Sequence, residues 1–192
     1  MNQSIKTALI FAGGKSTRMG KDKALLPFGK YNSLAAFQYH KLSTYFDKVY
    51  LSAKENKFDF PCEIIQDKYE IYSPLVGIIS AFESLEEEAI FILAVDAPFV
   101  NENVISTLLS CADKSDANAI VAQSPHGVQP LCGVYKKSIV SLAKIQLKKG
   151  NHKLQDLLTL GSSKFIYFED DDAFRNLNYP QEYQEALSCL KK

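Results

Sequence analysis

The sequence predicts an α/β protein, a three-layer α/β/α sandwich around a mostly parallel central sheet. Short apolar segments of strand length alternate along the chain with longer segments of helical periodicity. The segment Ala89–Val95 is apolar on both faces, as expected of a strand in the middle of a covered parallel sheet. The chain has 192 residues, 46% of them hydrophobic, so residues 1–192 are expected to form a single domain with a full core.

The first elements follow from apolar runs and capping signals. Thr7–Ala12 is an uninterrupted apolar run, typical of a buried strand. Ser33 is suited to cap a helix that continues to about Tyr45. Two further short strands are expected at Lys48–Ala53 and Glu63–Gln66. A second helix opens at Pro74, because proline is favoured in the first turn.

The rest of the chain continues the alternation. Asn101–Cys111 is expected to be a helix with an apolar face. The turn at Ser124–Gly127 separates two strands, so a local departure from parallel pairing is expected there. Gly150 ends a helix, and the acidic stretch Glu169–Asp172 is expected to be a solvated loop. The remaining strands are expected at Asn118–Gln123, Val128–Tyr135 and Lys164–Phe168, and the remaining helices at Lys136–Leu147, Lys153–Leu160 and Pro180–Leu190.

Charge and cysteine content exclude several classes of function. Lys plus Arg and Asp plus Glu number 22 each, so no global field would attract nucleic acid or a membrane surface. No run reaches membrane-spanning length, and the N-terminus lacks the apolar region of a signal peptide. The four cysteines lie far apart without a Cys-x-x-Cys pair, which favours reduced thiols and a cytoplasmic location. We expect a monomer.

The stretch Phe11–Lys23 directly follows the first strand and combines glycines with four cations, Lys15, Arg18, Lys21 and Lys23. Glycines let backbone N–H groups approach an anion, and loops at this position of α/β sheets bind nucleotides. The spacing fits neither the P-loop nor the dinucleotide fingerprint. We therefore predict a phosphate site of another kind; the alternative is a solvent loop with incidental charge.

Two carboxylates follow strands. Asp96 ends the most apolar strand, where a charged group is costly without a partner. A carboxylate facing a triphosphate is a usual way to hold Mg²⁺, so Asp96 is the candidate metal ligand. The alternative is a capping role, which Asn101 could also fill. Asp67 ends a neighbouring strand, and a site role for it is weighed against a turn carboxylate beside Lys68.

Five blocks of the sequence carry a family resemblance. The first, Ala12–Leu25, contains the highly specific run Arg-Met-Gly-Lys-Asp-Lys-Ala. The other four are moderate singly and strong together: Pro74–Ile78, Val95–Phe99, Gln129–Tyr135 and Asn176–Pro180. In this order the blocks resemble the molybdenum cofactor guanylyltransferase family, within the NTP-transferase superfamily of glycosyltransferase-A-like fold. The resemblance spans almost the whole chain and implies a Rossmann-like central sheet.

The resemblance also implies roles for matching positions. Lys23 would neutralise the phosphates, Arg18 the triphosphate or departing pyrophosphate, and Asp96 would bind Mg²⁺; these three are the candidate catalytic residues. The candidate nucleotide-binding residues are Phe11, Ala12, Gly13, Gly14, Lys23, Asp67 and Asp96. The candidate acceptor-side residues are Pro74, Gly77, Pro130 and Asn178. Ser52 and Tyr179 depart from the residues usual in the family, Asn and Thr.

The implied reaction is transfer of GMP from GTP to the terminal phosphate of molybdenum-molybdopterin, with release of pyrophosphate. The implied partners are GTP, the molybdopterin-type cofactor and delivery proteins specific to molybdoenzymes. Three alternatives stay open at this point. One is a CTP-using molybdenum cofactor cytidylyltransferase, and the second is a sugar-phosphate nucleotidyltransferase, since the glycine-rich loop does not fix the base. The third is a nucleotide-binding module without turnover.

Overall fold

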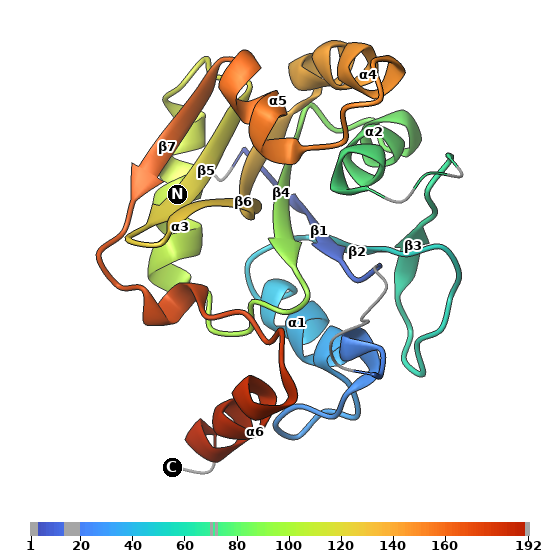
Figure 1. Cartoon of the computed structure of the whole chain (residues 1–192), viewed down its shortest axis with the longest axis vertical. Coiled ribbons are helices and arrows are strands. Elements are labelled where there is room, and N and C mark those ends of the chain that lie inside the picture. The colour runs from blue at the N-terminus through green and yellow to red at the C-terminus, as the bar shows by residue number, and fades with distance from the viewer. Residues whose placement is uncertain (1–3, 14–19, 70, 72, 191–192) are drawn as a thin grey trace.

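The computed structural model describes residues 4–13, 20–69, 71 and 73–190, in which seven strands form one sheet. Their order across the sheet is β3-β2-β1-β4-β6-β5-β7, so β4 lies at its centre (Figure 1). The strands are β1 (Thr7–Phe11), β2 (Lys48–Ser52), β3 (Glu63–Ile65), β4 (Ala89–Ala94), β5 (Ala119–Ser124), β6 (Gly127–Lys136) and β7 (Ser163–Tyr167). The β1 pairings with β2 and β4 are parallel, whereas β6 is antiparallel to both β4 and β5.

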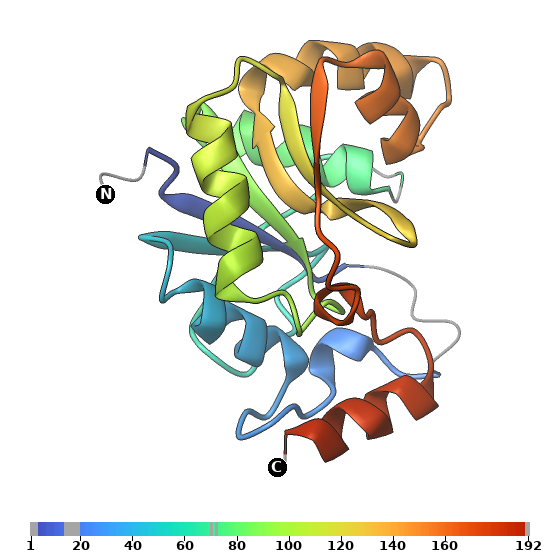
Figure 2. The ribbon, with the colours of Figure 1, turned by 90° about the vertical axis from the view of Figure 1, so that its left-hand side faces the viewer.

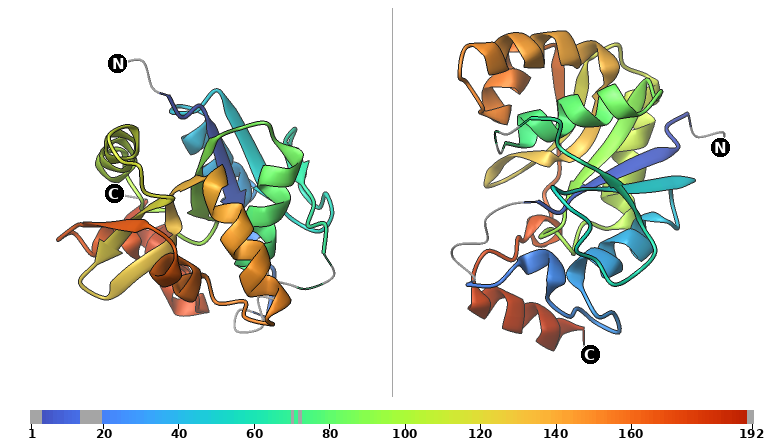
Figure 3. Two further views of the ribbon diagram at one scale, coloured as in Figure 1. Left: turned by 90° about the horizontal axis from the view of Figure 1, so that it is seen from above. Right: turned by 90° about the vertical axis from the view of Figure 1, so that its right-hand side faces the viewer.

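Helices cover both faces of the sheet, which confirms the predicted α/β/α sandwich (Figure 3). One core packs α1 and α3 against the sheet and extends to Tyr183 and Ala186 of α6, and the other packs α2, α4 and α5 against the opposite face of the sheet. The α-helices are α1 (Leu34–Leu42), α2 (Pro74–Ser84), α3 (Glu102–Asp113), α4 (Val140–Lys148), α5 (Leu154–Leu160) and α6 (Pro180–Cys189). Short 3₁₀ helices are η1 (Lys23–Leu25), η2 (Lys137–Ile139) and η3 (Asp172–Phe174).

The central strand alternates its side chains between the two cores. Phe91 and Leu93 face the core of α1 and α3, whereas Ile90 and Ile92 face the core of α2. All four are fully buried, which explains why this strand is apolar at every position. Burying one such side chain is worth about 1.5–3 kcal/mol, so β4 anchors both layers.

Local capping chemistry fixes where the helices begin. The Ser33 hydroxyl accepts a hydrogen bond from the Ala36 amide at 3.1 Å, as the sequence predicts. The Asn101 side chain accepts from the Val104 amide at 3.2 Å, so Asn101 rather than Asp96 caps α3. The Asp96 side chain is thereby left for other contacts.

Two predicted helix boundaries are wrong. The first helix ends at Leu42 rather than near Tyr45, because the Ser43 and Thr44 hydroxyls donate to the carbonyls of Tyr39 and Lys41 and compete with helix continuation. The helix expected at Lys136–Leu147 begins instead with η2 and becomes α-helical at Val140. Other boundaries agree with the expected ranges within one or two residues.

The last helix lies beside the segment that follows the glycine-rich loop (Figure 2). The Tyr183 hydroxyl on α6 donates to the carbonyl of Pro27, and Tyr183 and Ala186 are buried. This packing brings residues just before α6 close to η1, although more than 150 residues separate them in sequence. Within the described residues no helix is both long and apolar enough to cross a bilayer. Each of the four cysteines is a free thiol.

Candidate functional site

The carboxyl ends of β1 and β4 place the start of the glycine-rich loop beside Asp96. The Val95 amide donates to the Phe11 carbonyl at 3.0 Å, and the Ala12 amide donates to the Ser52 carbonyl at 3.1 Å. Phe11, Ala12 and Gly13 therefore leave the sheet at the edge where parallel strands of α/β folds present ligands. The backbone at Ala12 and Gly13 is fixed by the sheet before the loop begins.

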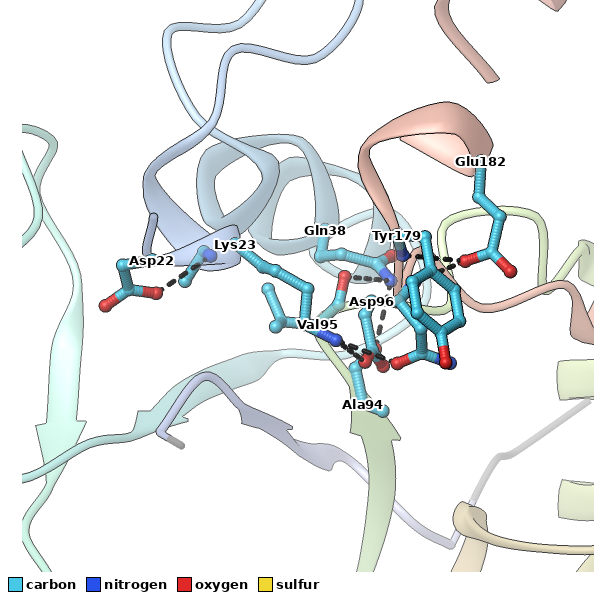
Figure 4. Close-up of polar contacts among 10 residues, drawn as sticks. Asp22, Lys23, Gln38, Ala94, Val95, Asp96, Tyr179 and Glu182 are labelled. Carbon is cyan, nitrogen blue, oxygen red and sulfur yellow. Dashed lines mark hydrogen bonds and ion pairs between the residues drawn. The ribbon is translucent and has the colours of Figure 1, made fainter. Parts of the chain in front are cut away.

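Three of the predicted site residues meet in one contact cluster. The Lys23 ammonium lies 2.6 Å from an Asp96 carboxylate oxygen and donates a second hydrogen bond, at 3.0 Å, to the Asn178 side-chain oxygen. Figure 4 shows Lys23 reaching from η1 toward Asp96 at the end of β4. The Lys23 and Asp96 side chains are 17% and 21% exposed, so the pair is shielded yet accessible from solvent.

The third member of this cluster is oriented by the start of α6. One carboxylate oxygen of Glu182 accepts hydrogen bonds from the amides of Asn178 and Tyr179, at 2.6 and 2.9 Å (Figure 4). A glutamate in the first turn satisfies amides that the helix leaves unpaired. The backbone of Leu177 is also tied to the Asp96 carbonyl, at 2.8 Å. The closing segment is therefore held against β4 by its backbone as well as by Lys23.

Lys57 is a site neighbour that no sequence pattern predicts. Its ammonium donates to the Ala12 carbonyl at 3.1 Å and forms an ion pair with Asp22. Asp22 in turn accepts from the Ala24 amide at 3.0 Å, which caps η1. Lys57 comes from the connection between β2 and β3, in a stretch without a recognisable motif, so only the fold brings it here.

Asp67 lies just after β3 and has a partly buried carboxyl group. Its oxygen Oδ1 is buried and has no hydrogen-bond partner among the described residues. Burial raises the pKa of Asp67, while the Lys54 charge and a hydrogen bond from Ser52 act in the opposite direction. An unpartnered buried carboxylate oxygen is costly, and a ligand hydroxyl or N–H donor would satisfy it.

A pocket of about 430 Å³ adjoins Asp96 on the side of β6 and α5. Among the described residues that line it, Asp96 supplies a negative charge and Lys153 a positive one. Pro74 and Pro130, both predicted on the acceptor side, contribute to its wall. Lys153 and Gln155 are polar lining residues that sequence reasoning missed, because they lie in a stretch without a motif. Gln129 and Asn176, also polar, lie in the blocks Gln129–Tyr135 and Asn176–Pro180 but are not among the predicted site residues. The full lining is Pro74, Ala94, Asp96, Ala97, Val100, Gln129, Pro130, Leu131, Cys132, Lys153, Leu154, Gln155, Phe174 and Asn176.

Gly77 lies in α2 against β1 and does not line this pocket. A Cβ atom built on Gly77 would stand 2.4 Å from Cε1 of Phe11 and 3.1 Å from the Ser52 hydroxyl oxygen. The glycine lets α2 pack closely over the strand end that carries Phe11. Its described contacts therefore point to packing beneath the site.

This close approach predicts the sign of a stability change. Gly77→Ala improves helix propensity by about 1 kcal/mol, but overpacking against the buried Phe11 ring costs about 1–3 kcal/mol. We expect a net loss and a lower melting temperature in thermal denaturation. The control is Ser84→Ala, at an exposed position of the same helix, which should stay within about 0.5 kcal/mol of the parent. A Gly77→Ala variant more stable than the parent would contradict the close packing.

Two predicted site residues, Gly14 and Arg18, lie outside the described residues, as does Lys15. Lys21 is described and is exposed. The positions that the structure brings together are thus the β1 end, Lys23, Asp96 and Asn178, with the pocket of Pro74 and Pro130 adjoining. Asp67 stands at the neighbouring strand end with its orphan oxygen.

The donor set at Asp96 fits one kind of metal. No cluster of three or more His, Cys, Asp or Glu side chains suited to a metal occurs among the described residues. Mg²⁺ does not need such a cage, because it usually keeps several waters and takes one or two carboxylates plus substrate phosphates. A lone, partly exposed carboxylate beside a lysine therefore fits Mg²⁺ that arrives with a nucleotide, and does not fit a structural zinc site.

Comparisons with known proteins agree with this arrangement. A family model described as MobA-like NTP transferase domain matches residues 8–164. The molybdenum cofactor guanylyltransferase of Campylobacter jejuni (strain RM1221) is 40% identical over 185 residues, which cover 95% of this chain and 96% of that protein. The protein of the same name from Helicobacter pylori (strain G27) is 32% identical over 189 residues, covering 96% and 92%.

Among solved structures, molybdopterin-guanine dinucleotide biosynthesis protein A from Archaeoglobus fulgidus has the same fold. Its TM-score is 0.83 at 19% identity, and the match covers 97% of this chain and 100% of that one. At this level of identity the likeness concerns the fold alone.

Proposed function

The chain belongs to the MobA-like NTP transferase family, and from this premise we propose that it transfers GMP from GTP to the terminal phosphate of molybdenum-molybdopterin, releasing pyrophosphate. It is a nucleotidyltransferase, and residues 1–192 act as one nucleotidyltransferase domain. The observation that carries the proposal is the contact between Lys23 and Asp96, which joins the glycine-rich loop to the tip of the central strand. A binding module without turnover would not need this pair.

On the nucleotide side, backbone groups of Phe11, Ala12, Gly13 and Gly14 hold the phosphates. Lys23 neutralises their charge, and Arg18 acts on the triphosphate or the departing pyrophosphate. Asp67 lines the nucleotide pocket, where its unpartnered oxygen can accept a hydrogen bond from the nucleoside. Charge-assisted contacts of this kind are the stronger hydrogen bonds.

Asp96 is the residue that would hold Mg²⁺ together with the phosphates. When bound, the ion acts as a Lewis acid on phosphate oxygens and helps to orient them. The chain's own part is to place one carboxylate at the strand tip with Lys23 and Asn178 around it.

The pocket beside Asp96 suits the acceptor. Pro74 and Pro130 form part of its wall, Asn178 stands beside Lys23 at the edge of the site, and Gly77 supports the strand end from below. Lys153 supplies the positive charge that an anionic acceptor needs, on the pocket wall formed by α5. The pocket and the strand edge share Asp96, so the acceptor phosphate and the nucleotide would meet there.

The reaction needs alignment more than covalent help from the protein. An oxygen of the acceptor phosphate forms a bond to the α-phosphorus of GTP, while the bond to the bridging oxygen breaks and that oxygen leaves with its electron pair as pyrophosphate. The acceptor phosphate is already a nucleophile, so no side chain has to form an intermediate. Orientation and neutralisation of developing charge by Lys23 and its neighbours supply the catalysis.

The setting and partners follow from this proposal. GTP and the molybdopterin-type cofactor are the substrates, and delivery proteins specific to molybdoenzymes receive the product. The free thiols support a reducing, cytoplasmic compartment. The protein is proposed to act as a monomer.

A pyrophosphate-release assay with four nucleotides tests the proposal. The protein is given molybdenum-molybdopterin, Mg²⁺ and either GTP, CTP, ATP or UTP, and thermal shifts with each nucleotide are measured in parallel. We expect release and the largest shift with GTP. Pyrophosphate release with CTP alone would identify the protein as a cytidylyltransferase instead. Release only when a sugar phosphate replaces the cofactor as acceptor would identify it as a sugar-phosphate nucleotidyltransferase. Binding without release would leave the non-catalytic module.

A further inference from the structure

The turn that carries Asp96 is held from behind by a buried glutamine. Gln38 lies in α1 and is fully buried. Its amide nitrogen Nε2 lies 3.2, 3.3 and 2.9 Å from the carbonyl oxygens of Ala94, Val95 and Ala97. These carbonyls flank Asp96 on both sides, and Figure 4 shows Gln38 directed at the strand end beneath it.

The three carbonyls lie at or just beyond Ala94, where β4 ends, and the Ala94 carbonyl also accepts a hydrogen bond from the Ala97 amide at 3.3 Å. A buried carbonyl without a donor is costly, and a side-chain amide is the donor that the fold provides here. The oxygen of the same amide, Gln38 Oε1, is buried and has no hydrogen-bond partner among the described residues, which is an energetic cost of this arrangement. The side chain is therefore placed by its donor end alone, as a structural element of the turn.

A second side chain on the same face of α1 continues this support. Lys41 donates to the carbonyls of Pro98 and Val100, at 3.0 and 3.1 Å. Burial lowers the pKa of Lys41 to about 7, and its neutral form still has two N–H donors for the two carbonyls. One turn of α1 thus contacts five carbonyls between Ala94 and Val100, which leaves the backbone around Asp96 little freedom.

We propose that Gln38 is a positioning residue for the reaction: by fixing the turn at the end of β4, it sets where the Asp96 carboxylate meets Lys23. This rests on the proposed function, since it takes Asp96 as part of the reacting site. Gln38 touches neither substrate nor metal and acts only through the backbone of that turn. A displacement of about 1 Å at a reacting group can lower turnover by about 10²-fold, so a residue beneath the site can matter greatly.

The test compares Gln38→Met with Gln38→Asn. Methionine keeps the length and volume but has no donor, and asparagine keeps the amide with a reach shorter by one methylene. For Gln38→Met we expect kcat to fall about 10²-fold while KM for GTP changes less than about threefold, because the turn positions a reacting group rather than the whole nucleotide. Gln38→Asn should fall between the parent and Gln38→Met, and it carries the test if the methionine variant does not fold.

The matched control is Thr7→Val, at the opposite end of β1. Thr7 is fully buried, and its hydroxyl donates to Glu87 at 2.9 Å, so this variant also loses one buried polar contact. It should lose comparable stability with unchanged kcat. If the Gln38 variants lose no more turnover than Thr7→Val at equal stability, Gln38 serves folding only and the proposal is overturned.

A crystal structure of the Gln38 variant gives a readout that does not depend on turnover. We expect the Lys23 ammonium and the Asp96 carboxylate to move beyond hydrogen-bond distance from each other. A structure that keeps the 2.6 Å contact would overturn the proposal, whatever the reaction proves to be. Absence of GTP turnover in the parent protein would instead refute the proposed function, so the two failures are distinguishable.

Discussion

Asp96→Asn is expected to lower turnover by about 10³-fold or more at ordinary Mg²⁺, with the fold intact. The substitution keeps the size of the side chain and removes its charge. It therefore weakens the contact with Lys23 and leaves the chain without its metal-binding carboxylate at the strand tip. Loss of a Lewis-acid position is worth several kcal/mol of barrier, and each 1.36 kcal/mol is about tenfold in rate. Pyrophosphate release measures the loss of turnover, and thermal denaturation measures whether the fold is intact.

Binding of GTP separates this explanation from general damage. Without Mg²⁺, the Asp96 carboxylate repels the phosphates, so Asp96→Asn should bind metal-free GTP at least as tightly as the parent. With Mg²⁺, the parent should gain affinity and the variant should gain little. The control is Asp116→Asn, at an exposed position just before the start of β5. It should leave the affinity for GTP unchanged both without and with Mg²⁺. Turnover close to normal in Asp96→Asn would refute the metal role.

The features that sequence analysis placed correctly are those encoded by local pattern. The apolar run at β4 predicted a central strand, and residues that follow strands predicted the edge where Lys23 and Asp96 meet. The carboxyl ends of parallel strands lie at the same edge of a sheet, so a short motif after each strand is enough to predict which residues meet there. The antiparallel pairing of β6 could be anticipated because the turn at Ser124–Gly127 joins it directly to β5.

The residues that sequence analysis missed act through long-range contacts. Gln38 lies in a helix whose apolar neighbours gave no sign of a polar function, and its partners are carbonyls 56 to 59 positions away. Lys57 likewise reaches Ala12 and Asp22 from an irregular connection. A backbone carbonyl carries no residue identity, so no pattern in the chain records that a side chain will bind it. Such supports become visible only when the elements are packed.

Lys23→Ala is expected to lower kcat/KM by about 10²–10³-fold, as for removal of one electrostatic donor from a preorganised site. The Lys23 ammonium is shielded between Asp96 and Asn178, so its charge is weakly screened and its position is fixed before a nucleotide arrives. The control is Lys21→Ala, two residues earlier and exposed, where solvent screens the charge and the loss should be severalfold at most. Steady-state rates of pyrophosphate release measure both variants.

The double variant Lys23→Ala, Asp96→Asn decides whether the two residues act as a unit. Residues in contact show large coupling, whereas distant ones add. The Lys23 ammonium and the Asp96 carboxylate lie 2.6 Å apart. The double variant should therefore have nearly the same turnover as the less active of the two single variants, because the second substitution removes a group that has already lost its partner. Fully multiplicative losses would mean that the two side chains work independently. Equal, small losses for Lys23→Ala and Lys21→Ala would mean that the loop charge is incidental and that the contact with Asp96 only stabilises the fold.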